Sequence, residues 1–195
     1  HQVYTYREML TLYVGEHSWI NFGFYLILGL PSDQLVNFRE EMFLPDYLED
    51  NLSKGQVDTR PLAAAEKILI PATLSVSSIP SLLRPTVVMW ILAILWGLGS
   101  IFLPRHLARG LDTLLATLLF AAGTLFTFMW FGTDHIATHR NLNLLWANPL
   151  YLGVLISGWR GVNGTGWLFI TGSGVVLTLV GYFGLPQTFH PAIIP

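Results

Sequence analysis

A polar cluster at residues 132–141 lies between two long apolar stretches, and it holds the side chains best suited to chemistry. Asp134 stands directly before His135, and His139 follows four residues later. A carboxylate beside an imidazole can fix its tautomer and form an acid/base pair, and two histidines four residues apart can share one side of a helix. We therefore predict Asp134, His135 and His139 as the catalytic candidates.

The same cluster has a purely structural interpretation, which the residues alone leave open. A loop between two membrane spans is polar in any case, Thr133 or Asp134 can cap a helix, and Asn141 can cap the next one. The polar side chains that follow, Arg140, Asn141 and Asn143, are predicted to bind substrate. Two histidines and one aspartate without a further ligand do not predict a metal site, and no cofactor is expected.

The rest of the chain offers little further chemistry. It contains no cysteine, so it holds neither a disulfide, nor a zinc-thiolate site, nor a thiol nucleophile. It also lacks a glycine-rich phosphate loop, a paired-carboxylate signature and a basic aromatic surface, so no nucleic-acid partner is expected. His17 beside Glu16 is more simply a solvated or interfacial residue than a catalytic one. From chemistry alone the residues do not name a reaction.

The composition indicates a membrane protein. Hydrophobic residues make up 52% of the chain and charged residues only 11%, which is too little polar surface to coat a soluble globule of this size. Charge is also unevenly placed. Ten acids and five bases precede Arg84, a net charge of −5, whereas five arginines and two aspartates from Arg84 onward give +3. The composition therefore places a boundary near residue 84.

Four closely spaced transmembrane helices are predicted after this boundary. Their expected ranges are Thr86–Leu103, Leu111–Phe131, Leu142–Ser157 and Trp167–Leu185. The third span carries Pro149 in its interior and is expected to kink there. The fold class is therefore mainly α, a polytopic helical membrane protein with about four transmembrane helices and a small N-terminal extramembrane helical lobe.

The predicted lobe and connector comprise residues 1–83. The run Ser18–Leu30 is apolar but too short to span, so a buried or interfacial helix is predicted, with a fifth span over Leu10–Leu30 as the alternative. Other helices are predicted at Tyr4–Tyr13, Asp33–Met42 and Asp46–Leu52, followed by a connector at Val57–Leu83.

Loop charge predicts the orientation. Arg105, Arg109 and Arg160 lie in the first and third loops, which favours a cytoplasmic position for both. The lobe, the loop at 132–140 and the tail at 187–195 are then expected on the outer side of the four-helix domain at 84–186. The expected location is a bacterial inner membrane, with the lobe and the tail in the periplasm.

Two stretches in different halves of the chain resemble a known family. The first is WINFGFYLILGLPSD at 19–33 with EMFLPDYL at 41–48, and the second is Thr133-Asp134-His135 with NLNLLWANP at 141–149. Together they resemble the membrane proteins of Bacteroidota that carry a periplasmic papain-like lobe followed by a helical bundle. This family includes the lipoprotein N-acyltransferase called Lnb.

The resemblance implies acyl transfer from a phospholipid, through a thiol in the periplasmic lobe, to the free α-amine of a lipid-modified cysteine on a lipoprotein. The family's cysteine lies just ahead of the stretch that resembles residues 5–10, and its histidine partner lies still earlier. Neither is in this sequence, so the chain is expected to be the C-terminal portion of a longer protein. The polar cluster would then hold the lipid headgroup or orient the amine, with membrane lipids and lipoproteins as partners.

An alternative hypothesis is a non-enzymatic structural subunit of a larger inner-membrane complex. The absence of a nucleophile in the chain favours it, and other membrane subunits would then be the partners. A transporter is disfavoured, because no ionisable residue lies in the middle of a span.

Overall fold

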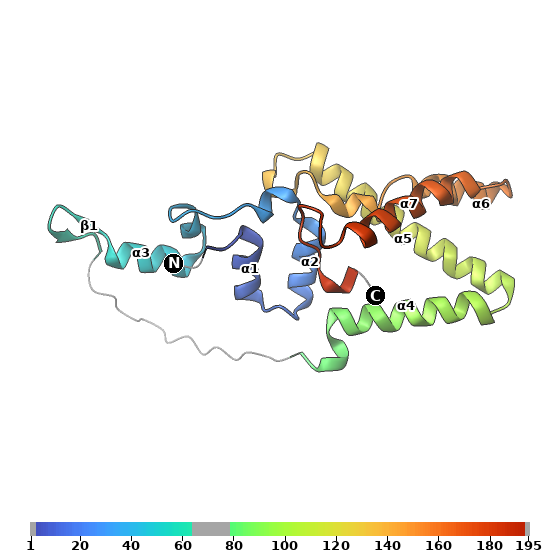
Figure 1. Cartoon of the computed structure of the whole chain (residues 1–195), viewed down its shortest axis with the longest axis horizontal. Helices are drawn as coiled ribbons and strands as arrows, with labels where there is room; N and C mark the ends of the chain where they lie inside the picture. The colour runs from blue at the N-terminus through green and yellow to red at the C-terminus, as the bar shows by residue number, and fades with distance from the viewer. Residues whose placement is uncertain (1–2, 64–78, 194–195) are drawn as a thin grey trace.

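The computed structural model describes residues 3–63 and 79–193. The chain is mainly helical, with long helices at one end and short helices at the other (Figure 1). A small hairpin of two short strands is the sheet in the described part.

The first two predicted spans are confirmed as long apolar helices, α4 (Pro85–Phe102) and α5 (Arg105–Phe131). Proline fits at the start of α4, because a first-turn residue needs no N–H partner. Both helices are long and apolar enough to cross a membrane, at 18 and 27 residues. Phe102 and Phe128 are 77% and 60% exposed. Such side chains suit contact with lipid or with another chain rather than with water.

The prediction of a continuous third span at Leu142–Ser157 is wrong. The structure has a 3-10 helix, η5 (Leu142–Leu145), and then α6 (Tyr151–Arg160) of ten residues. Pro149 breaks the helix between them, because it lacks an N–H and restricts the backbone of the residue before it. At the place of the last predicted span lies α7 (Thr165–Gly181), an apolar helix of 17 residues that is shorter than α4 and α5.

The lobe begins with two confirmed helices of nine residues each, α1 (Tyr6–Val14) and α2 (Trp19–Ile27). Thr5 and Glu8 form a reciprocal capping box at the start of α1, and Ser18 caps α2. Gly15 ends α1 with φ of 81°, a conformation that favours glycine. The break at Gly15 excludes the alternative of one membrane span over 10–30.

The predicted helix at Asp33–Met42 is wrong. Two 3-10 turns, η1 (Leu30–Asp33) and η2 (Glu40–Phe43), flank an extended segment in which the Val36 amide donates to the Tyr4 carbonyl at 2.9 Å. This extended backbone places Val36 in a small core with Met9 and Leu44. Core packing outweighs the weak helical pattern of the segment.

The predicted helix at Asp46–Leu52 is confirmed as α3 (Pro45–Lys54), which ends at Gly55. The antiparallel strands β1 (Gln56–Val57) and β2 (Arg60–Pro61) follow it, and they were not predicted. Most of the predicted connector lies outside the described residues, and its far end holds η3 (Ser81–Leu83).

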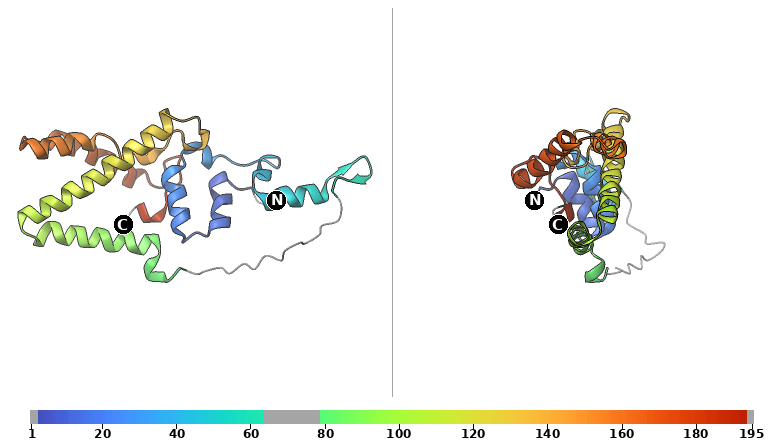
Figure 2. Two further views of the ribbon diagram at one scale, coloured as in Figure 1. Left: turned by 180° about the vertical axis from the view of Figure 1, so that it is seen from behind. Right: turned by 90° about the vertical axis from the view of Figure 1, so that its right-hand side faces the viewer.

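The short helix α2 runs across the end of the long helices (Figures 1 and 2). The indole N–H of Trp19 donates to the Leu83 carbonyl at 2.9 Å, just before α4. Beside α2, η1 contacts η4 (Ile136–Thr138) in the loop after α5, and η6 (Pro191–Ile193) contacts α4. The lobe, this loop and the tail therefore meet at one end of the bundle.

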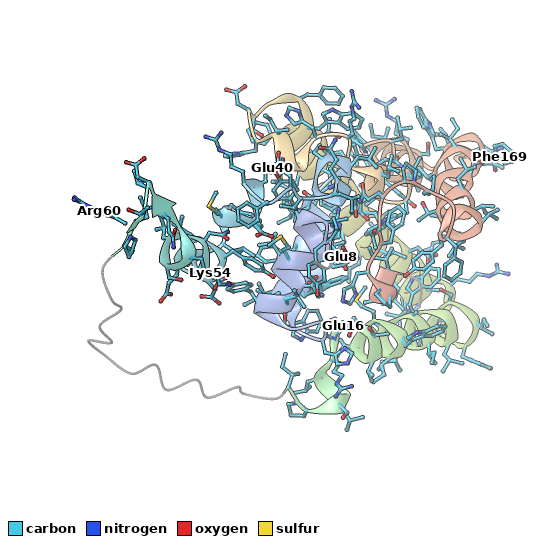
Figure 3. All side chains as sticks on the ribbon, turned by 60° about the vertical axis from the view of Figure 1, so that its left-hand side comes forward. Glu8, Glu16, Glu40, Lys54, Arg60 and Phe169 are labelled. Atoms are coloured by element: carbon cyan, nitrogen blue, oxygen red, sulfur yellow. The ribbon has the colours of Figure 1, made fainter. Side chains whose placement is uncertain are left out.

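The labelled charged side chains of Figure 3 lie on the lobe, whereas Phe169 points outward from α7 at the opposite end. The labelled residues of the lobe are Glu8, Glu16, Glu40, Lys54 and Arg60.

The contact between lobe and bundle leaves no room for a side chain at Gly29. A methyl group there would overlap the backbone carbonyl of His139, whereas one at Gly23, within α2, meets nothing within 4 Å. We expect Gly29→Ala to lower the free energy of unfolding by about 1–3 kcal/mol. Gly23→Ala, the control, should leave it unchanged or raise it by about 0.5–1 kcal/mol. Thermal unfolding of the detergent-solubilised variants measures both, and equal stability of the two would contradict the contact.

Candidate functional site

Arg7 is the most deeply buried charge of the lobe, at 1% exposure. Its Nε and Nη2 atoms each donate to the Asp33 carboxylate at 2.9 Å, a two-point pairing that fixes both side chains. Nη2 also donates to the carbonyls of Leu28 and Gly29, at 3.1 and 3.2 Å. The guanidinium carbon lies 4.9 Å from the centre of the Tyr25 ring. Arg7 thus ties α1 to the corner between α2 and η1.

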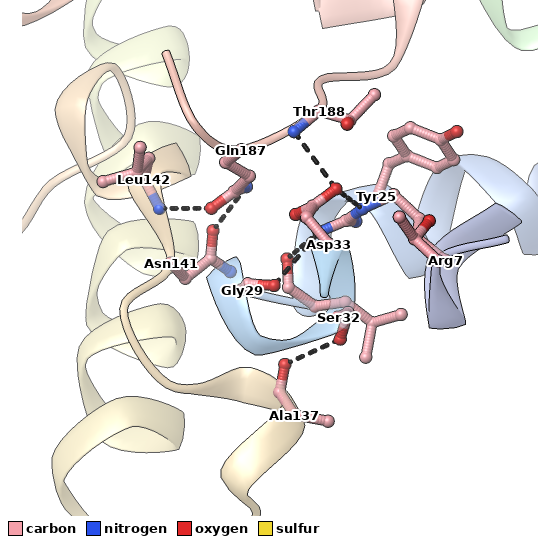
Figure 4. A network of polar contacts seen from close by, with 12 residues as sticks. Arg7, Tyr25, Gly29, Ser32, Asp33, Ala137, Asn141, Leu142, Gln187 and Thr188 are labelled. Carbon is pink, nitrogen blue, oxygen red and sulfur yellow. Dashed lines mark hydrogen bonds and ion pairs between the residues drawn. The ribbon is translucent and has the colours of Figure 1, made fainter. Parts of the chain in front are cut away.

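The same corner is bonded to the loop that follows α5 (Figure 4). The Gly29 amide and the Ser32 hydroxyl both donate to the Ala137 carbonyl, at 2.9 and 3.2 Å. Asp33 also accepts from the amide of Thr188 in the tail, at 3.3 Å. Three segments that are far apart in the sequence are therefore held together by polar contacts.

Asn141 and Asn143 cap the end of α2. Asn141 donates to the carbonyls of residues 26 and 27 at 2.7 and 3.1 Å, and Asn143 donates to those of residues 25 and 26 at 2.9 and 3.1 Å. The last carbonyls of a helix have no partner within it, so donors must come from elsewhere. Both asparagines are at most 1% exposed, and Gln187 bonds to Asn141 from the tail at 3.3 Å. In this structure the two side chains serve the scaffold, and a role in substrate binding stays a prediction.

Asn141 also accepts from the Asn143 amide at 3.0 Å, as the N-cap of η5. The structural interpretation, in which Asn141 caps the next helical element, is therefore confirmed. Asp134 does not cap η4, which starts at Ile136 without a side-chain cap, whereas the Thr133 hydroxyl donates to the Met129 carbonyl in the last turn of α5 at 2.8 Å.

The catalytic candidates do not form the predicted arrangement. Because η4 is a single 3-10 turn, His135 and His139 do not share one side of an α-helix. Asp134 and His135 are both exposed, and within the described residues no hydrogen bond or ion pair joins Asp134 to either histidine. His139 Nε2 lies 3.2 Å from the Thr133 carbonyl oxygen. A carbonyl only accepts, so Nε2 carries the proton and Nδ1 is the acceptor of the neutral ring.

A cleft of about 220 Å³ lies on the surface where η1 meets the loop that carries η4. The lobe contributes Leu30, Pro31 and Gln34, and the loop contributes Ile136, His139 and Arg140. The polar residues that line the cleft are Gln34, His139 and Arg140. The guanidinium of Arg140 and the amide of Gln34 can donate to an anion or to carbonyl oxygens, whereas the N–H of His139 is already directed at Thr133. The cleft contains no nucleophile, so it can bind and orient a molecule but cannot attack one. Within the described ranges, no group of three His, Asp or Glu residues could hold a metal ion.

His190 is a buried titratable residue beside α2 that the sequence analysis missed. It is 3% exposed, between the rings of Phe22 and Tyr25 at 5.2 and 5.4 Å, and its Nδ1 accepts from the Ala192 amide at 3.0 Å. Burial lowers the pKa of His190 below its usual value. In the sequence, His190 stands out only as a polar residue within an apolar tail, and Gln187 stands out in the same way.

The caps on α2 predict a specific effect on stability. Asn143→Ala removes two donors from buried carbonyls, so we expect a loss of about 1–3 kcal/mol in the free energy of unfolding. The matched control, Asn163→Ala, removes an exposed asparagine and should cost less than about 1 kcal/mol. Thermal unfolding in detergent measures both changes. An Asn143→Ala protein that is as stable as the wild type would show that the cap is not needed.

Comparison with known proteins places the chain in a family. Residues 77–195, more than half of the chain, match the family model of the Lnb transmembrane domain. No curated protein and no solved structure matches the chain. The matched range contains α4 to α7, the cleft residues of the loop, and both asparagines that cap α2. The chain is therefore a membrane protein that belongs to the Lnb family.

Proposed function

We propose that the chain is part of an inner-membrane acyltransferase that moves an acyl chain from a phospholipid to the N-terminus of lipoproteins. Membership of the Lnb family supports this proposal. The observation that carries it is the fixed contact between the lobe and the loop after α5, through the amide of Gly29 and the carbonyl of Ala137. This contact holds extramembrane residues next to the end of a membrane helix, where both lipid substrates would present their polar groups.

The proposed reaction has two steps. A thiolate attacks the ester carbonyl of a phospholipid, which forms a thioester and releases a lysophospholipid, and the α-amine of the lipoprotein then attacks the thioester and frees the thiol. The chain has no cysteine, so we propose that the thiol comes from outside this sequence. The residues near the cleft would position the substrates, together with Asp134 and His135, which are exposed in the loop just before η4.

The proposed topology has four membrane crossings. α4, α5 and α7 would each cross, and η5 with α6 would form a broken crossing whose interrupted backbone is covered by neighbouring helices. Residues 84–186 would form this domain, while residues 1–83 and 187–195 would lie in the periplasm of a member of the Bacteroidota. Membrane lipids and lipoproteins would be its partners.

The acyltransferase proposal predicts a selective loss of activity at His135. In the full-length protein in membranes, His135→Ala should lower N-acylation of a lipoprotein by at least about tenfold, because this exposed ring lies where the amine would be oriented. The amount of folded protein should not change, since the side chain is exposed. Mass spectrometry of the lipoprotein N-terminus measures the product. His106→Ala, at the other end of α5, is the control, and unchanged acylation in the His135 variant would remove this residue from the site.

The second candidate is a structural subunit of a larger membrane complex. Two observations favour it: the chain carries no cysteine, and only 6% of the apolar window of α4 is buried within the chain. A partner subunit could cover this helix as well as lipid could.

The native protein distinguishes the two candidates. For an acyltransferase, we expect an intact mass well above 21.8 kDa, with a cysteine-containing peptide ahead of His1. Intact-mass measurement and peptide sequencing of the protein purified from its native membrane test this expectation. A cysteine-free protein of about this mass, in a stable complex that does not acylate lipoproteins, would support the structural subunit instead.

A further inference from the structure

We propose that the cleft between η1 and the η4 loop binds the phosphodiester group of a glycerophospholipid, with Arg140 as its charged donor. The proposal rests on the proposed function, in which a phospholipid supplies the acyl chain, and it names where the headgroup of that lipid is held.

The position of the cleft matches the depth of lipid headgroups. α5 ends at Phe131, and the rings of Trp130 and Phe131 stack with their centres 4.8 Å apart. Phe131 and Ile136 are 73% and 71% exposed. Aromatic side chains at the end of a membrane helix lie at the interface between hydrocarbon and water. His139 and Arg140 follow α5 by eight and nine residues, so the cleft lies just beyond that interface.

The lining of the cleft suits a small polar group with a carbon chain attached. Gln34, His139 and Arg140 supply the polar wall, and Leu30, Pro31 and Ile136 supply the apolar wall. At about 220 Å³ the cleft is smaller than a typical pocket for a drug-sized ligand. It could take a phosphodiester with part of its glycerol, whereas the acyl chains would remain in the membrane.

The backbone of Arg140 is held in an unfavourable conformation. Its φ is 52°, in the left-handed region, which costs a non-glycine residue about 1–2 kcal/mol. Two contacts maintain it: the Leu30 amide donates to the Arg140 carbonyl at 3.4 Å, and the next residue, Asn141, is bonded to α2. The surrounding structure therefore fixes the base of this side chain at the edge of the cleft, as strained residues at binding sites often are.

The charge of Arg140 is not neutralised by the protein. Among the residues that the structure describes, no carboxylate forms an ion pair with it, whereas Arg7 forms a two-point ion pair with Asp33. A planar guanidinium can donate two parallel hydrogen bonds to a phosphate, which a lysine cannot do. An anion is therefore the ligand that the cleft favours over the amine of the lipoprotein.

The test uses the full-length protein in detergent, with short-chain phosphatidylethanolamine, short-chain diacylglycerol and inorganic phosphate as three separate probes. Isothermal titration calorimetry measures binding. We expect the phospholipid to bind and the diacylglycerol not to bind. Arg140→Gln should weaken phospholipid binding by about tenfold or more, because a charged hydrogen-bond donor is lost. Arg160→Gln, the same charge change at the far end of α6, should leave binding unchanged.

Arg140→Gly separates binding from folding. Glycine relieves the left-handed strain, so this variant should be at least as stable as the wild type and yet lose phospholipid binding to the same extent as Arg140→Gln. Unchanged binding in both Arg140 variants would overturn the proposal. Binding of inorganic phosphate without binding of the phospholipid would also overturn it, since the cleft would then be a site for a free anion.

Binding and acylation together separate this site from the proposed function. Arg140-dependent phospholipid binding in a protein that never acylates lipoproteins would leave the site standing and remove the acyltransferase. Normal acylation by Arg140 variants that also bind the phospholipid normally would leave the acyltransferase standing and remove the site.

Discussion

The last carbonyls of α2 accept hydrogen bonds from side chains of distant segments, and the arrangement of lobe and bundle depends on these bonds. Five successive carbonyls, from Tyr25 to Gly29, accept hydrogen bonds from side chains of other segments. Asn141 and Asn143 serve the last turn of the helix, and Arg7 serves the two residues beyond it. An unpaired carbonyl at this depth would cost free energy comparable to a lost hydrogen bond. Because the donors come from α1 and from the loop beyond α5, the helix end can be closed only when both are in place.

This requirement couples the parts of the molecule. Asp33 neutralises Arg7 and also accepts from the tail amide of Thr188, while Gln187 bonds to both the side chain of Asn141 and the amide of Leu142. Removing one partner of a buried charge pair leaves the other charge uncompensated, which is strongly unfavourable. The lobe therefore cannot separate from the loop without exposing several buried polar groups together. A rigid connection of this kind keeps the cleft between η1 and η4 in one shape.

Local signals in the sequence were sufficient to predict helices that do not depend on distant partners. The helical periodicity of Tyr4–Tyr13, the proline at the start of α4 and the long apolar runs predicted α1, α4 and α5 correctly. The failures involve distant partners. Val36 is extended because its amide meets Tyr4, and nothing in the local pattern of residues 33–42 shows this. Asn143 was expected to bind substrate because a polar residue beside a membrane span looks like a ligand. Its partners are backbone carbonyls of α2, and the types of side chain in the sequence do not predict such contacts.

The same distinction separates the polar residues that hold the fold from those left for a ligand. Arg7, Asn141 and Asn143 are buried, and their bonds go to groups of the chain. Arg140 follows the opposite pattern, because it is exposed, its charge has no counter-ion within the described residues, and its backbone is strained. Stability alone would favour glycine at a left-handed position. An arginine held there by contacts to Leu30 and Asn141 costs stability without improving the packing of the chain, which is the balance expected where a guanidinium is kept for binding.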